Sequence, residues 1–384
     1  MFLSEAPASR QSHGTDRRLS VLTGSADAHG PCDGVRVKRH RLLDLSVAQE
    51  GDAAAVEELR HWFRRQLTAS DDTVRLIHGH NLHHFSSAPA HALAALRKDL
   101  GLVLLHTYHS IWRRPEDERI ARDCAVWDVH HAVSDFLVSE CTEVLQQEVR
   151  RTYLGVNTSV YSSIPELRET SRHPVVLLPA RLIPNKGAMV AITMLKHLLR
   201  RVAAAGPGPT VPRPRLVLTD PFDTVDFHGE RGDFRRRLSR HIEGCGLTEG
   251  PGQDVEFRTA GIGHMAKLYE EATVVVYPSR FEEPMGLAPL EAMCAGRPVV
   301  ATGVGGLGEG GSTLVALDKG KTDDEDEDEL ASRFAEEVWR LLSTPGEARR
   351  AGRAAREHVR ANFDLEQVYV EPMLDEYERL LGTS

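Results

Sequence analysis

The strongest constraint on the fold is the segment 272–302, in which two apolar stretches flank a short polar and helical region. Ala272-Thr-Val-Val-Val-Tyr277 and Pro298-Val-Val-Ala-Thr302 have the near-continuous apolar character of strands buried in a parallel sheet. Between them, Pro284 and Gly286 prevent a single uninterrupted helix. The segment therefore predicts a strand, a loop, a short helix and a second, parallel strand.

Two carboxylates with seven residues between them, Glu283 and Glu291, lie in this segment. The pattern places Glu283 in the loop beyond a strand's carboxyl end and Glu291 inside the helix that follows. Open α/β sheets bind ligands in that crevice, and a helix amino terminus there favours anions. The pair therefore suits a ligand that carries both hydroxyls and phosphate, such as a sugar nucleotide.

This segment resembles the EX7E motif of family 4 retaining glycosyltransferases. The match extends to its neighbours: Pro278-Ser279, Met285-Gly286-Leu287, Leu290 to Met293, Ala295 to Ala301, Gly305-Gly306 and Glu309. The resemblance implies an α/β protein of the GT-B fold, with two Rossmann-like doubly wound parallel-sheet domains facing a central cleft. The simpler interpretation, a structural βαβ unit with two solvated glutamates, does not account for these neighbours.

A second match lies upstream, where the apolar stretch beginning at Val175 is followed by Arg181 and by Lys186 before a glycine. The family places an Arg and a Lys at this spacing to hold the donor diphosphate. Fixed cations stabilise the negative charge that grows on a leaving diphosphate. The alternative is an ordinary surface Arg and Lys at a strand end.

The resemblance implies transfer of a hexose from a UDP- or GDP-linked sugar to a hydroxyl acceptor, with retention of configuration. Glu291 would accept hydrogen bonds from the ribose, and Glu283 would hold hydroxyls of the transferred sugar. Backbone amides at Met285, Gly286 and Leu287 would add donors for the phosphates. No metal or other cofactor is expected, and the acceptor could be a small molecule, a lipid or a glycan.

Histidines concentrate at strand ends in the first half of the chain. Leu105-His-Thr-Tyr-His-Ser110 ends a predicted strand, and the resemblance gives His109 a contact with the transferred sugar near the reacting carbon. His106 would point to the opposite face. The predicted catalytic residues are therefore Glu283, His109, Arg181 and Lys186.

A second histidine group, His78 to His84, also follows a strand. Its spacing could suggest a metal, but no partner Cys or HExxH pattern supports one. The group is either acceptor-facing or structural. Trp112 could stack on an acceptor ring or could serve packing alone.

Charge and cysteine content exclude several other classes of protein. The net charge is −9, which leaves no basic footprint for nucleic acid. Five cysteines, widely spaced and without a CxxC pair, suit a reducing cytoplasm. No apolar run approaches the ~18 residues of a membrane span. Leu195 to Val202 has a little basic amphipathic character; we expect an ordinary helix there, and peripheral membrane contact stays open.

Alternating strands and helices predict an N-terminal domain at 1–165, a nucleotide-sugar-binding domain at 174–365 and a helix at 366–384 crossing back. A linker is expected at Ser162 to Pro174. The acidic run Asp323 to Glu329 is expected to be a solvated loop without a metal, because like charges repel.

The chain departs from the family at its beginning. Relatives start with a strand and a Gly-rich turn, whereas the first 18 residues here show neither pattern. Either the start codon is assigned too far downstream, or this is a shortened relative, which could be a non-catalytic accessory protein. A third possibility is a GT-B sugar-phosphate synthase or phosphorylase.

Overall fold

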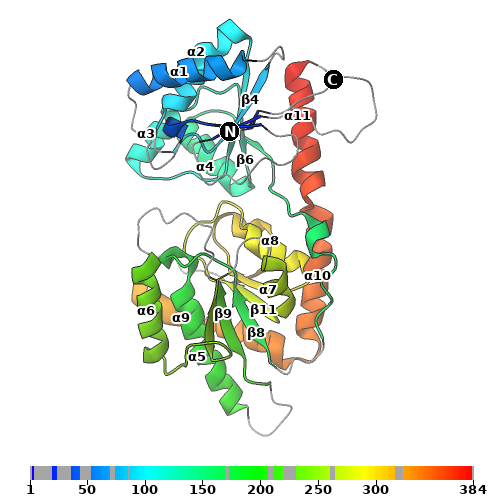
Figure 1. Cartoon of the computed structure of the whole chain (residues 1–384). Helices are drawn as coiled ribbons and strands as arrows, with labels where there is room; N and C mark the ends of the chain where they lie inside the picture. Colours follow the sequence, from blue (N-terminus) through cyan, green and yellow to red (C-terminus); the bar gives the residue numbers. More distant parts are fainter. Residues whose placement is uncertain are drawn as a thin grey trace. The chain divides into compact units, whose positions relative to one another are not determined.

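The chain forms two compact units in the computed structural model (Figure 1). The structure describes residues 2–3, 20–23, 36–43, 53–69, 74–84, 86–168, 173–205, 211–219, 231–259, 264–315 and 323–382. The first unit comprises Met1–Tyr153 and Tyr369–Ser384, and the second comprises Leu154–Val368. The chain thus passes from the first unit to the second after Tyr153, before the expected linker at 162–174. It returns to the first unit after Val368, just inside the segment 366–384 that is expected to cross back.

A seven-stranded sheet organises the first unit, in the order β3-β2-β1-β4-β5-β6-β7. The strands are β1 Phe2–Leu3, β2 Ser20–Thr23, β3 Arg36–Arg39, β4 Leu76–His80, β5 Val103–Tyr108, β6 Val129–Ala132 and β7 Arg150–Arg151. The helical segments are η1 Arg41–Leu43, α1 Ala53–Leu67, α2 Ala88–Leu100, α3 Pro115–Asp123, α4 Asp135–Leu145 and α11 Glu371–Leu381. Strands β4 to β7 pair in parallel, as do β2 and β3, which confirms the predicted Rossmann-like sheet.

One strand of this sheet contradicts the sequence prediction. Phe2–Leu3 forms β1, which lies between β2 and β4 and pairs antiparallel with both. The expectation that the first 18 residues contain no strand is therefore wrong. Two residues are too few to show an alternating pattern, and they pair because β2 and β4 would otherwise present unpaired backbone groups to each other. Residues 4–19 lie outside the described part of the chain.

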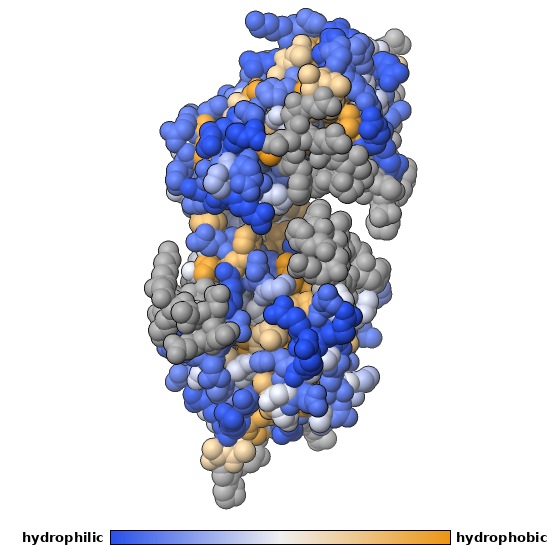
Figure 2. Space-filling model, turned by 90° about the vertical axis from the view of Figure 1, so that its left-hand side faces the viewer, coloured by the Kyte–Doolittle hydropathy of each residue, from blue (hydrophilic) through white to orange (hydrophobic). Residues whose placement is uncertain are grey.

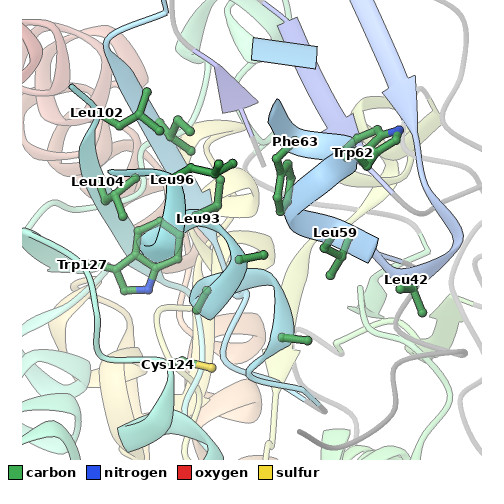
Figure 3. Close-up of a cluster of buried hydrophobic side chains, with 14 of the residues drawn as sticks. Leu42, Leu59, Trp62, Phe63, Leu93, Leu96, Leu102, Leu104, Cys124 and Trp127 are labelled. Atoms are coloured by element: carbon green, nitrogen blue, oxygen red, sulfur yellow. The ribbon is translucent and has the colours of Figure 1, made fainter. Parts of the chain in front are cut away.

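The core of the first unit lies between the sheet and the helices α1 and α2. Apolar residues of α1 recur at helical spacing at Leu59, Trp62 and Phe63, and all three are buried. They belong to the same cluster of buried side chains as Leu93 of α2 and Leu104 of β5, which Figure 3 shows. Burying such a side chain contributes roughly 1.5–3 kcal/mol. This packing fixes one face of β4 and β5, so that alternate residues of these strands face the other side.

A six-stranded parallel sheet organises the second unit, in the order β10-β9-β8-β11-β12-β13. The strands are β8 Val175–Leu178, β9 Arg215–Thr219, β10 Val255–Arg258, β11 Val274–Tyr277, β12 Val299–Thr302 and β13 Thr313–Val315. Every residue of β8, β11 and β12 is buried, as expected for strands covered on both faces.

The helical segments of the second unit are η2 Thr158–Tyr161, η3 Pro184–Lys186, α5 Ala188–Ala204, α6 Arg231–Gly244, α7 Met265–Glu271, α8 Leu287–Cys294, η5 Gly305–Glu309, α9 Asp323–Ser343 and α10 Glu347–Asn362. The π-helical turn η6, Glu366–Val370, follows α10. Figure 1 shows α5, α6 and α9 on one side of the sheet and α8 and α10 on the other, which is a doubly wound arrangement. The stretch 195–202 lies in α5, where Leu195 and Leu198 are fully buried.

The acidic run does not form the expected loop. Residues 323–329 begin α9, a helix of 21 residues. A helix amino terminus carries a positive partial charge, which favours acidic residues in its first turn. Glu327 also accepts a hydrogen bond from Arg280 at 2.8 Å, and Asp328 lies 3.0 Å from His197 Nε2.

Hydrophilic side chains dominate most of the face shown in Figure 2, and apolar ones are scattered among them. Among the described residues, the large hydrophobic side chains classed as exposed are Val160 and Leu287. Within that same part of the chain, no helix is long and apolar enough to cross a bilayer.

Candidate active site

The sheet of the second unit reverses its strand order between β8 and β11. From β8 the chain proceeds outward to β9 and β10, and then returns to the other side of β8 with β11. The segment after β8 carries Arg181 and Lys186, and the segment after β11 carries Ser279 and Glu283. The carboxyl ends of two strands at such a switch point form the crevice where α/β sheets bind ligands.

Lys186 and Glu283 form a buried ion pair in this crevice. Lys186 Nζ lies 2.5 Å from Glu283 Oε1, and the two residues are 9% and 4% exposed. Ser279 Oγ donates to the same carboxylate oxygen at 2.8 Å. Glu283 Oε2 has no hydrogen-bond partner among the described residues. One oxygen of the carboxylate is therefore fixed by the protein, and the other remains for a ligand.

The charge around this pair favours an anionic ligand. Burial lowers the pKa of the Lys186 ammonium, while Glu283 raises it and Arg181 lowers it. Arg181 is exposed, and no hydrogen bond or ion pair joins its side chain to another residue in the described ranges. A solvated cation beside a buried one can meet two oxygens of a diphosphate.

Backbone packing holds the two sides of the crevice together. Gly187 follows Lys186 with φ +76°, and a Cβ there would lie 2.0 Å from the carbonyl oxygen of Pro278. Gly306 N–H donates to the carbonyl oxygen of Glu283 at 2.7 Å. A Cβ on Gly305 would lie 2.5 Å from that same oxygen. Side chains at these glycines would push the loops of Lys186 and Glu283 away from their neighbours.

We expect Gly187→Ala to displace Lys186 and to destabilise the second unit by roughly 1–3 kcal/mol, because the residue would combine positive φ with a clash against backbone. Urea denaturation measures the loss. Gly246→Ala is the matched control, since Gly246 has φ +71° but a Cβ added there would meet no atom within 4 Å. Equal losses in both variants would show that φ alone, and not the approach of Pro278, restricts position 187.

Glu291 lies in α8, as predicted, but it has protein partners. Tyr269 donates its hydroxyl proton to Glu291 Oε2 at 2.9 Å. Tyr161 lies near the same carboxylate, and its ring lies 5.9 Å from that of Tyr269. Burial raises the pKa of Glu291, and the two tyrosine hydroxyls oppose that rise. A carboxylate offers about four acceptor positions, so two tyrosines leave room for ligand hydroxyls.

The predicted backbone amide donors, Met285, Gly286 and Leu287, lie at the start of α8. Gly286 adopts φ +89°, and a Cβ there would lie 2.4 Å from Leu307 Cδ2. Met285 is buried, whereas Leu287, the first helical residue, is 40% exposed. The first amides of a helix have no partner within the helix and are free to bind an anion.

His109 belongs to the first unit, at the end of β5. Its backbone N–H donates to Asn81 Oδ1 at 2.8 Å, and its Nε2 lies 2.8 Å from His80 Nδ1. Burial lowers the pKa of His109 to about 4, so the ring is neutral at pH 7. His106 is fully buried and accepts from the Leu82 N–H at 3.0 Å, on the face that carries Trp127.

The second histidine group makes contacts within the first unit. His83 Nε2 and His84 Nε2 each lie 2.8 Å from Ser110, at its carbonyl and hydroxyl oxygens respectively. Trp112 stacks on His84 with ring centroids 4.2 Å apart. Among the described residues, no group of three potential metal ligands comes together.

Several contacts of the predicted site residues could not be read from the sequence. Ser279 belongs to the matched motif, but only the fold shows that its hydroxyl reaches Glu283. Tyr161 and Tyr269 lie 130 and 22 residues before Glu291 in the chain. No local pattern in the sequence indicates that these two tyrosines lie near the same carboxylate.

Known proteins resemble this chain in sequence and in fold. The family described as Glycosyl transferases group 1 matches residues 162–358. Glycogen synthase of Mycobacterium tuberculosis is 35% identical over 160 residues, which cover 40% of this chain and 35% of the relative. The chain thus aligns with about a third of that curated relative's length.

Solved structures match nearly the whole chain, but their sequence identity to it is lower. Sucrose-phosphate synthase from Thermosynechococcus elongatus has a TM-score of 0.69 and 21% identity, covering 95% of this chain and 89% of its own. Anabaena HepE, solved with UDP and glucose, has a TM-score of 0.63 and 19% identity, covering 90% and 86%. These neighbours show the GT-B fold, and the family match covers more than half of the sequence. The chain therefore belongs to the group 1 glycosyl transferases.

Proposed function

We propose that this protein is a retaining, family 4 glycosyltransferase that moves a hexose from a UDP- or GDP-linked sugar to a hydroxyl acceptor. The buried Lys186–Glu283 pair beside the solvated Arg181 carries this proposal. Its two cations suit a diphosphate, and the second oxygen of its carboxylate suits a sugar hydroxyl. That HepE was solved with UDP and glucose supports a uridine donor.

Each residue of the site has a defined part in this scheme. Arg181 and Lys186 neutralise the diphosphate as it leaves. Glu283 Oε2 accepts from a hydroxyl of the transferred sugar, while Lys186 and Ser279 hold Oε1. Glu291 accepts from the ribose on the positions that Tyr269 and Tyr161 leave open.

The reaction itself needs no residue as nucleophile. The departing phosphate takes the acceptor's proton on the face it leaves, so the acceptor oxygen attacks that same face and configuration is retained. His109 contacts the transferred sugar as a neutral ring. Because Arg181 and Lys186 supply the positive charge, the scheme requires no metal. NMR of the product's anomeric proton distinguishes retention from inversion.

A sugar-phosphate synthase is the second candidate, since sucrose-phosphate synthase shares the fold. It would use the same donor site and differ in its acceptor. Turnover that appears only with sugar phosphates as acceptors would favour it over transfer to an unphosphorylated hydroxyl compound.

Nucleotide binding tests the donor site directly. In a thermal-shift panel of UDP, GDP, ADP and dTDP, we expect one nucleotide to raise the melting temperature. At 100 times its dissociation constant a ligand stabilises by about 2.7 kcal/mol. The shift should disappear in Glu291→Ala, because the ribose hydroxyls lose their acceptor.

Glu282→Ala is the matched control for that panel, since Glu282 is an exposed carboxylate next to the site and should leave the shift intact. A folded protein that responds to none of the four nucleotides would contradict the proposed donor site. That result would favour a non-catalytic relative.

A further inference from the structure

His80 of β4 forms a pair with His109 that the predicted roles do not use. His80 Nδ1 and His109 Nε2 are 2.8 Å apart. Burial lowers the pKa of His80 to about 2 and that of His109 to about 4, so both rings are neutral near pH 7. Between two neutral imidazoles one nitrogen donates and the other accepts. The tautomer of His109 is therefore tied to that of His80.

The ring of His80 is itself held in place by its neighbours. It packs on His78 with ring centroids 4.0 Å apart. His78 uses both nitrogens, with Nδ1 2.5 Å from the Tyr377 hydroxyl and Nε2 2.7 Å from Thr107 Oγ1. These contacts connect β4, β5 and α11, which Figure 1 shows beside the sheet of this unit. His80 thus rests on a ring that cannot rotate without losing two hydrogen bonds.

The other side of His109 is open to a ligand. Its backbone is fixed by Asn81, a residue with φ +50° whose own N–H donates to the Thr107 carbonyl at 3.3 Å. Its Nδ1 has no hydrogen-bond partner in the part of the chain that the structure describes. Because Nε2 is used by His80, Nδ1 is the nitrogen that can meet a substrate.

We propose that His80 is a positioning residue, which fixes the ring orientation and tautomer of His109 so that His109 Nδ1 presents one defined hydrogen-bonding character to the transferred sugar. The inference rests on the proposed function, which gives His109 its contact with that sugar. The partner of one imidazole nitrogen sets the state of the other.

The test compares His80→Phe with His80→Asn in the full chain. Phe keeps the ring's stacking but removes the hydrogen bond, whereas the Asn amide can occupy the place of Nδ1. Donor hydrolysis, measured as released nucleoside diphosphate, should fall in kcat by about 10- to 100-fold in His80→Phe, the loss typical for hydrogen-bond partners of metal-ligating histidines. The donor KM should not change, and His80→Asn should recover much of the rate.

A spectroscopic measurement separates positioning from general damage. In ¹⁵N-histidine-labelled protein, the ring nitrogens of His109, assigned by their loss in His109→Ala, should show one tautomer in the wild type and a mixture in His80→Phe. His130→Phe removes another buried histidine of the same sheet and should leave the His109 tautomer unchanged.

A single His109 tautomer and an unchanged kcat in His80→Phe would overturn the proposal. If His80→Phe does not fold, Tyr377→Phe provides the test. This variant frees His78 Nδ1 and should loosen the contact between His80 and His109. An unaltered NMR signal of His109 in Tyr377→Phe would contradict the proposal. If His109→Ala retains full activity, the assigned role of His109 fails, while the NMR result still decides whether His80 sets its tautomer.

Discussion

Lys186→Ala should lower the kcat for donor cleavage by about 10²–10³-fold, the loss typical of removing one group that stabilises charge in a transition state. The same change should destabilise the second unit by about 3–5 kcal/mol, because it leaves the Glu283 carboxylate buried without its cation. Released nucleoside diphosphate measures the first effect, and urea denaturation measures the second.

Arg181→Ala provides the contrast within the same site. Arg181 is exposed and unpaired within the described residues, so its loss should reduce the rate while changing the free energy of unfolding by no more than about 0.5 kcal/mol. If Lys186→Ala were as stable as Arg181→Ala, the buried pair would contribute nothing to folding. If both variants kept full activity, neither cation would act on the diphosphate.

Acidification should unfold the first unit at a higher pH than the one at which protonation of carboxylates usually unfolds proteins. Burial lowers the pKa of His80 to about 2 and those of His84 and His109 to about 4, whereas an unfolded histidine titrates near 6.5. As the pH falls below about 6.5, these histidines become protonated in the unfolded chain but stay neutral in the folded unit. Stability is therefore complete above that pH and declines toward pH 4.

The size of this effect follows from the number of histidines. Each histidine lowers the free energy of unfolding by about 1.4 kcal/mol per pH unit below 6.5. His80, His84 and His109 together therefore lower it by about 4 kcal/mol at pH 5.5. Burial also lowers the pKa values of His78, His83 and His106, which adds to the loss. Native domains have only about 5–15 kcal/mol in total. The urea midpoint should thus fall steeply between pH 7 and pH 5.5.

Tryptophan fluorescence can follow this transition in one unit. Trp62, Trp112 and Trp127 lie in the first unit, so Trp339→Phe leaves a signal from that unit alone. His84→Gln should reduce the pH dependence by one histidine's share, because Gln can keep the hydrogen bond to Ser110 Oγ. A midpoint that does not change from pH 7.5 to pH 5.5 would contradict the prediction.

Apolar runs and turn residues predicted the secondary structure around the two glutamates. The strand, loop and helix around Glu283 and Glu291 appear as predicted. These features depend on neighbours within a few residues, which a sequence displays directly. The acidic run is helical and not the predicted loop, and Arg280 and His197 contact Glu327 and Asp328 from positions that the local sequence does not display.

The sequence by itself determined the α/β class, the family resemblance and the side of the sheet on which Arg181, Lys186 and Glu283 lie, since strand ends follow from chain direction. Only the tertiary structure decided that Lys186 pairs with Glu283, that Tyr269 reaches Glu291, and that His80 holds His109. It also placed β1 between β2 and β4. Such contacts join residues that the chain separates by tens of positions, and they depend on which strands become neighbours and which groups burial leaves in need of a partner.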